Sequence, residues 1–137
     1  MGQYATGYRL EHRVERLYAS HGWLSTRYPK SGRRLYPADV LALKRLGGET
    51  VIHLVECKNL SRGTRNATLY LDRSQVQKLI VTAEKHDARA LVAYSFPRQH
   101  ARILDAKELN SSGKMLSIGK MDGVPLKKFL QSFRPPG

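Results

Sequence analysis

A carboxylate and a lysine two residues apart stand at the end of an apolar run in this sequence. Residues 51–58, VIHLVECK, predict a largely buried strand that ends in Glu56 and Lys58. Side chains two apart in a strand face the same side, about 6.7 Å apart along the chain, so this pair projects together while Cys57 points into the packing. Charge in an apolar strand is costly unless it is paired or binds something. The two residues therefore form either an ion pair or part of a binding site.

A second carboxylate, Asp39, lies upstream of this strand, at a sequence spacing that lets the two segments pair as a hairpin. Residues 39–44 and 50–58 predict two strands joined at Gly47-Gly48. Paired strands lie roughly 4.8 Å apart, so Asp39 and Glu56 can converge on one ion. Two carboxylates with a backbone carbonyl and waters suit Mg²⁺ or Mn²⁺. Glu11 would add a third carboxylate if the first helix packs over the strand ends.

Such a site predicts hydrolysis of a phosphate ester. A hard divalent cation neutralises the scissile phosphate and lowers the pKa of a bound water. Lys58 would orient that water or stabilise charge in the transition state. The structural alternative is a solvated Glu56–Lys58 ion pair, which contributes little to stability and is common on strands. Asp39 at hairpin distance and the charge of the whole chain favour the catalytic interpretation.

The charge balance indicates a polyanionic partner. The 24 Lys and Arg against 11 Asp and Glu give a net charge of +13 and a sequence pI of about 10.2. For a small domain this is the electrostatic footprint of nucleic-acid binding. The alternative is a soluble or ribosome-like structural protein with a basic surface. Two polar segments, 28–37 and 59–71, are predicted to be loops. Their cations are expected to contact DNA phosphates, and they are Lys30, Arg33, Arg34, Arg62 and Arg65.

Length and composition predict one globular domain over residues 1–137, with the segment after about 110 left unassigned. The single cysteine excludes an internal disulfide and a cysteine zinc cluster, and the five histidines show no metal-ligand spacing. No apolar run is long enough to span a bilayer, and the start, MGQYATGYRLEH, lacks a signal-peptide core. We therefore expect a cytoplasmic protein with no membrane partner.

The apolar spacing predicts an α/β fold with one mixed central sheet flanked by helices. The polar stretch 59–71 is expected to be an exposed, mobile loop, and the tail from residue 114 to hold an edge strand. Helices are predicted at 3–21, 73–86, 106–109 and 125–133, and strands at 23–27, 39–44, 50–58, 88–96 and 102–104.

These motifs, in this order, resemble the PD-(D/E)xK nucleases and most closely the archaeal-type Holliday junction resolvases. The resemblance covers residues 7 to about 109. It includes Gly7 with Glu11, the run HGWLSTRYPKSG, PADVLALK with Asp39, and VECK, followed by YLDRSQVQKLIVTA with Gln75. One departure is Ala38, which separates Asp39 from the proline and should alter how the chain enters the strand.

The resemblance implies a restriction-endonuclease-like fold and a homodimer that nicks two opposed strands of a four-way DNA junction, using Mg²⁺ or Mn²⁺. It assigns Glu11, Asp39 and Glu56 to the metal and makes Lys58 the catalytic lysine. Ser31 would lie near the scissile phosphate, and Arg27 would be a DNA or active-site contact. It also implies a DNA-associated protein of archaeal or viral type, with no small-molecule substrate.

Several alternatives stay open at this point. A related nuclease of the same fold would act on duplex or flap DNA, and a non-catalytic architectural protein would bind DNA without cutting it. Glu15, one turn after Glu11, is a rival for the third carboxylate, although an exposed Glu15 paired with Arg13 or Arg16 is simpler. Gln75 would either hydrogen-bond near the metal or merely begin a helix.

Overall fold

The computed structural model describes residues 3–28, 38–59, 68–96 and 99–133. The helices and strands follow one another along the chain as α1 (Gln3–Ser20), β1 (Leu24–Arg27), β2 (Val40–Leu46), β3 (Glu49–Asn59), β4 (Thr68–Asp72), α2 (Arg73–Lys85), β5 (Arg89–Ser95), β6 (Arg102–Asp105), the 3₁₀ turn η1 (Ala106–Glu108), β7 (Asn110–Ser112), β8 (Met115–Gly119), β9 (Val124–Pro125) and α3 (Leu126–Gln131).

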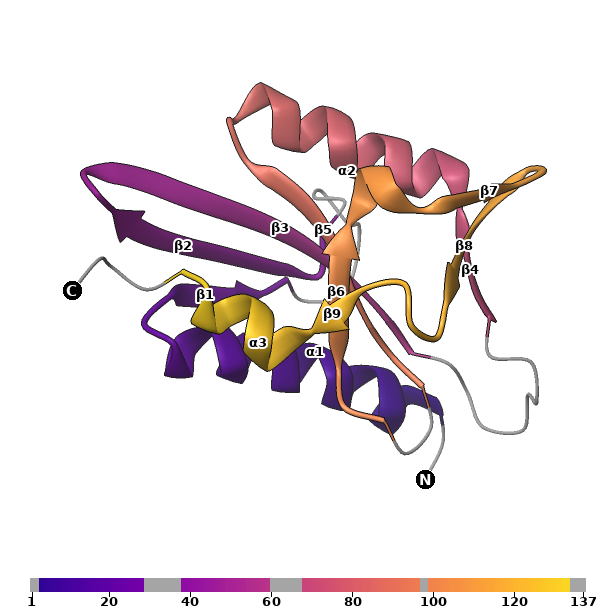
Figure 1. Ribbon diagram of the computed structural model, residues 1–137, viewed down its shortest axis with the longest axis horizontal. Coiled ribbons are helices and arrows are strands. Elements are labelled where there is room, and N and C mark those ends of the chain that lie inside the picture. The colour runs from indigo at the N-terminus through magenta and orange to yellow at the C-terminus, as the bar shows by residue number, and fades with distance from the viewer. Residues whose placement is uncertain (1–2, 29–37, 60–67, 97–98, 134–137) are drawn as a thin grey trace.

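A six-stranded mixed sheet forms the centre of the molecule, in the order β1-β2-β3-β5-β6-β9. The pair β3–β5 is parallel and the other neighbours are antiparallel. A parallel pair needs a crossover connection, and the segment between β3 and β5 contains α2. Helix α2 covers one face of the sheet, and α1 and α3 lie on the other (Figure 1). The predicted α/β fold with a mixed, helix-flanked sheet is confirmed.

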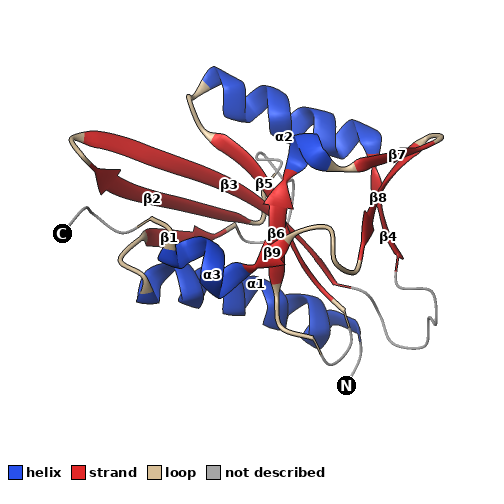
Figure 2. Ribbon diagram, viewed as in Figure 1, coloured by secondary structure: helices blue, strands red, loops and turns tan. Residues whose placement is uncertain are grey.

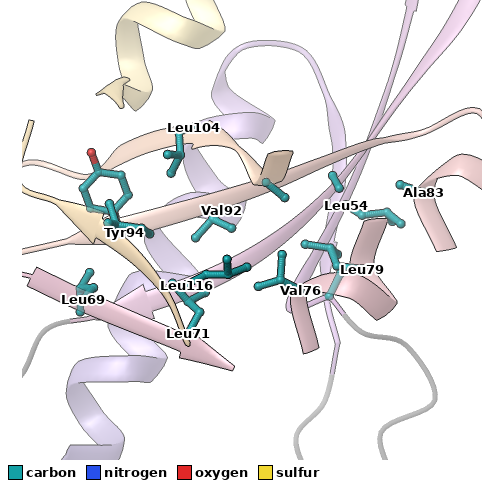
Figure 3. Close-up of a cluster of buried hydrophobic side chains, with 14 of the residues drawn as sticks. Leu54, Leu69, Leu71, Val76, Leu79, Ala83, Val92, Tyr94, Leu104 and Leu116 are labelled. Atoms are coloured by element: carbon teal, nitrogen blue, oxygen red, sulfur yellow. The ribbon is translucent and has the colours of Figure 1, made fainter. Parts of the chain in front are cut away.

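Two hydrophobic clusters fill the spaces between the sheet and the helices, and we call them the α2-side and α1-side clusters. Strand β5 lies between the two clusters, and its successive side chains point alternately into each. Val92 and Tyr94 pack in the α2-side cluster, whereas Leu91 and Ala93 pack in the α1-side cluster. Figure 3 shows the α2-side cluster, in which α2 contributes Val76 and Leu79. Because β5 is buried on both faces, its residues 90–94 form an unbroken apolar run rather than an alternating one.

The hairpin between β2 and β3 forms where the sequence predicts it. Leu46 pairs with Glu49, so Gly47 and Gly48 make a two-residue turn. Both glycines have positive φ, 57° and 84°, which is the conformation that this tight turn requires. The turn fixes the register of the two strands, in which Val40 pairs with Val55 at the other end of the hairpin.

A second sheet, of three strands in the order β4-β8-β7, corrects one prediction (Figure 2). The end of the stretch 59–71, expected to be an exposed loop, forms β4, because Leu69 and Leu71 alternate into the α2-side cluster. The tail from residue 114, predicted to hold an edge strand, contains β9 at the edge of the central sheet and also β8, which lies between β4 and β7 and buries Leu116 and Ile118 in the same cluster.

The remaining elements agree with their predicted positions. Helices α1, α2 and α3 and strands β1, β5 and β6 fall within a few residues of the expected ranges. Asp72 caps the start of α2, because its carboxylate accepts a hydrogen bond from the Ser74 N–H. None of the helices that the structure describes is long and apolar enough to cross a membrane.

Candidate active site

Asp39 is the residue through which β1, β2 and β3 meet. Its N–H donates to the Val55 carbonyl (2.9 Å), and its own carbonyl accepts from the Tyr28 N–H (2.9 Å). Its carboxylate Oδ2 accepts from the Cys57 N–H at 2.8 Å. The residue is only 2% exposed. The Asp39 carboxylate is therefore held against the peptide group that joins Glu56 to Cys57.

The backbone departs from regular strand geometry at Asp39. Residues two apart in a strand share a face. Ala38, however, packs in the α2-side cluster, whereas Val40 packs in the α1-side cluster. The chain thus passes from one face of the sheet to the other at Asp39, which agrees with the altered start of this strand expected from Ala38.

Glu56 and Lys58 lie on β3, just beyond Val55, the last residue of β3 that pairs with β2, and beside β5. Their partners on the parallel strand are Val92 and Tyr94. Glu56 is half-buried and Lys58 is exposed. Cys57, between them, packs against the α1-side cluster, as predicted. Glu56 is thus partly withdrawn from water, whereas Lys58 is open to solvent.

Glu11 approaches the sheet from α1 and is 5% exposed. Its neighbour Leu10 belongs to the α1-side cluster, whereas alternation along β3 assigns Glu56 to the α2 side, with Leu54. Within the described parts of the chain, no three or more His, Cys, Asp or Glu side chains are grouped closely enough to hold a metal ion.

The chemistry of these carboxylates nevertheless fits a hard divalent cation. Carboxylate oxygens are the ligands that Mg²⁺ and Mn²⁺ prefer. Two of them, on Glu11 and Asp39, are almost fully buried, where a negative charge requires compensation. Asp39 and the Glu56 backbone are in contact through the Cys57 N–H, so these two residues form the nucleus of a candidate site.

Glu15 has a different partner from the one predicted. It is half-buried, and both of its carboxylate oxygens bind Arg27: Oε2 accepts from the Arg27 N–H (3.1 Å) and Oε1 from Arg27 Nε (2.9 Å). The expected exposed pairing with Arg13 or Arg16 is wrong. Glu15 and Arg27 meet because α1 packs on β1, a tertiary contact for which the helical spacing of charges gives no signal.

Some of the predicted site residues cannot be placed. Ser31 and the loop cations Lys30, Arg33, Arg34, Arg62 and Arg65 lie outside the described residues. Gln75 is exposed in the first turn of α2.

The family comparison covers almost the whole chain. The family model described as archaeal Holliday junction resolvase (Hjc) matches residues 2–135. This chain belongs to the archaeal Holliday junction resolvase family. It is accordingly a junction-resolving endonuclease, of a family whose members are generally metal-dependent. Its substrate is junction DNA, as the resemblance of the motifs implied.

The fold of this resolvase is also that of a solved relative. The structure of Archaeoglobus fulgidus Hjc, a Holliday junction resolvase from an archaeal hyperthermophile, matches it with a TM-score of 0.72. The two chains are 23% identical, and the match covers 90% of the resolvase described here and 99% of the A. fulgidus chain. A search of the curated proteins found no match.

Proposed function

We propose that this resolvase acts as a homodimer that hydrolyses one phosphodiester in each of two opposed strands of a four-way junction, with Mg²⁺ or Mn²⁺. The observation that carries the proposal is the contact between the Asp39 carboxylate and the Glu56–Cys57 peptide. It holds the Asp39 carboxylate against the peptide group that follows Glu56, with Lys58 two residues further along the same strand as Glu56. A purely structural role for these residues would not require an aspartate, a glutamate and a lysine together.

In this proposal Asp39 and Glu56 bind the metal ion, and Glu11 is the third ligand that the family resemblance implies. The bound ion would supply charge neutralisation at the phosphate and a water of lowered pKa. Because Lys58 is exposed at the end of a rigid strand, its ammonium can reach the phosphate oxygens and stabilise the charge that develops on them. Asp39 is kept in place by the Cys57 N–H before any substrate arrives.

DNA binding would come from phosphate contacts made around this site. Arg27 is half-buried beside it and is oriented by Glu15. Ser31 would lie near the scissile phosphate, and the loop cations would contact the arms of the junction: Lys30, Arg33, Arg34, Arg62 and Arg65. Phosphate contacts position a protein without reading bases, so specificity would follow from junction shape. The enzyme would be a cytoplasmic, DNA-associated protein. Residues 1–137 would form one nuclease domain.

The test compares a labelled synthetic four-way junction with linear duplex of the same sequence, in Mg²⁺ or EDTA. Wild type should make paired, symmetric nicks in the junction only. Glu56→Ala should abolish the nicks while junction binding is retained, and EDTA should do the same. Glu49→Ala is the matched control, because Glu49 is an exposed glutamate on the same strand, about 23 Å from Glu56 at 3.3 Å per residue. It should cleave like wild type.

Other outcomes would contradict specific parts of the proposal. Full cleavage by Glu56→Ala would show that the site is misassigned. Cutting of linear duplex as fast as the junction would indicate a general nuclease. Tight binding without nicks in any divalent ion would indicate a protein that binds junctions without cutting them.

A further inference from the structure

Arg27 is held by one carboxylate at two points. Glu15 accepts a hydrogen bond from the Arg27 backbone N–H and a second one from its guanidinium Nε. A third tie lies two residues earlier on β1, where the Ser25 hydroxyl donates to the Glu15 carbonyl at 2.8 Å. The Glu15 and Arg27 side chains are only 23% and 27% exposed, so water competes weakly for these bonds. Helix α1 therefore fixes both the backbone and the side chain of Arg27.

The hydrogen-bonded pair Glu15 and Arg27 lies directly beside the candidate active site. Arg27 is the cross-strand partner of Val40, the residue after Asp39. The next residue, Tyr28, donates its N–H to the Asp39 carbonyl. Asp39 in turn binds the Cys57 N–H on β3. A continuous series of hydrogen bonds and strand pairs thus connects Glu15 on α1 to the strand that carries Glu56 and Lys58.

We propose that Glu15 is a positioning residue for junction cleavage, which holds the Arg27 guanidinium in the orientation that contacts the scissile strand. This inference rests on the proposed function. An acceptor at Nε sets the plane of the guanidinium, and hence the direction in which its two terminal NH₂ groups point. Orientation matters because Arg recognises phosphate through a planar, two-pronged geometry.

Fixing the guanidinium in advance should affect cleavage more than binding. Many cations contribute to the affinity of a protein with a net charge of +13, so the loss of one orientation changes affinity little. A misplaced contact at the reacting phosphate costs about 10- to 100-fold in rate. Glu15 also partly offsets the charge of Arg27, so removing it should not weaken the attraction for DNA.

The test measures single-turnover cleavage of a four-way junction in Mg²⁺ with enzyme in saturating excess, and junction affinity separately in Ca²⁺. Glu15→Gln, which is isosteric, should lower the cleavage rate constant about 10- to 100-fold and leave the dissociation constant within about threefold. Arg27→Lys keeps the cation but loses the planar fork, and it should give the same pattern. In the Arg27→Ala background, Glu15→Gln should cause no further loss, because Arg27 is what Glu15 positions.

Asp105→Asn is the matched control. Asp105 also accepts from one arginine Nε, that of Arg89 (3.2 Å), and from one backbone N–H, that of Lys107 (2.9 Å). This pair joins β5 to β6 and is not part of the site. Asp105→Asn should therefore lower the melting temperature about as much as Glu15→Gln without slowing cleavage.

The inference is overturned if Glu15→Gln cleaves at the wild-type rate, if its effect multiplies with that of Arg27→Ala, or if Asp105→Asn slows cleavage equally. Glu56→Ala separates this failure from that of the proposed function. If Glu56→Ala abolishes cleavage while Glu15→Gln does not slow it, only the inference about Glu15 fails. If Glu56→Ala cleaves normally, the assigned site fails, and the inference fails with it.

Discussion

At Asp39 a structural contact and a proposed catalytic contact use the same carboxylate. One oxygen accepts the Cys57 N–H and thereby joins the start of β2 to the end of β3. The carboxylate as a whole is also an expected metal ligand. These two roles can be separated, because the first requires only a hydrogen-bond acceptor, whereas the second requires a negative charge.

Asp39→Asn and Asp39→Ala should therefore differ in stability and agree in activity. The Asn carbonyl can still accept the Cys57 N–H, so its unfolding free energy should stay within about 1 kcal/mol of wild type. Asp39→Ala leaves that N–H without this acceptor and should cost about 1–3 kcal/mol more. Both variants should lose junction cleavage, measured beside urea unfolding. Normal cleavage by Asp39→Asn would show that the charge has no catalytic role.

The spacing of residues predicted the positions of Asp39, Glu56 and Lys58 because a hairpin and strand alternation are local properties. Two residues on one strand and one on its hairpin partner are placed by the turn at Gly47-Gly48 alone. The pairing of Glu15 with Arg27 depends instead on how α1 lies against β1, and no periodicity in the sequence encodes that angle. For the same reason Glu11 could be identified as a candidate ligand but not placed relative to Glu56.

Among the elements, α1, β3 and α3 are joined at one buried histidine. His53 is fully buried, and its Nδ1 is hydrogen-bonded to the Tyr18 hydroxyl at 2.9 Å. Its ring packs against Trp23 and Phe129, with ring centroids 4.5 and 5.7 Å away. Burial, and to a lesser extent the charge of Arg89, lowers the pKa of His53 from 6.5 to about 3. His53 is thus packed in the interior in its neutral form.

This burial predicts how stability depends on pH. The pKa of His53 is lower in the folded protein than in the unfolded chain, so the unfolded chain takes up the proton first. The contribution of His53 is complete above pH 6.5 and is lost as the pH falls toward 3, by up to about 1.4 kcal/mol per pH unit. His53→Asn, which can keep the bond to Tyr18, removes this titration.

Urea unfolding of wild type and His53→Asn at pH 7, 6, 5 and 4 measures the effect. The stability advantage of wild type should shrink steadily as the pH falls below 6.5. The carboxylates titrate in both proteins, so they cancel in the difference. A difference that stays constant over this range would contradict a neutral, buried His53.

The long periodic elements were predictable, and so were the four-residue strands β1 and β6, whereas β4 and β7 were not. The alternation or helical spacing in α1, α2, β3 and β5 extends over enough residues to identify each element. Strand β4 has five residues and follows a polar, basic stretch, so its two buried leucines were not recognised as a strand. Strands β7 and β9 are shorter still, and β8 becomes a central strand only through its partners on both sides.

For the whole molecule, the net charge of +13 governs how it meets DNA. Each phosphate that a cation neutralises should lower the logarithm of the association constant by about 0.9 per tenfold increase in salt. Removing two loop cations together, with Arg33→Ala and Arg34→Ala, should reduce that slope by about 2. Titrations of a labelled junction at several salt concentrations, without cleavage, measure the slope.

Lys85→Ala is the control for this measurement, because Lys85 is an exposed cation at the end of α2 to which no DNA contact is assigned. Its slope should equal that of wild type. A wild-type affinity that hardly changes with salt would contradict the phosphate-contact mode of binding.

The first and last helices bury their apolar side chains in one cluster, where Leu10 and Val14 of α1 share the interior with Leu126 and Leu130 of α3. During synthesis α1 leaves the ribosome about a hundred residues before α3 does, an interval of about 5 to 20 s at ordinary elongation rates. Throughout that time its apolar face lacks part of its cover. Since Glu11 adjoins Leu10, a nascent chain is expected to complete the proposed nuclease site only after the last helix has been translated.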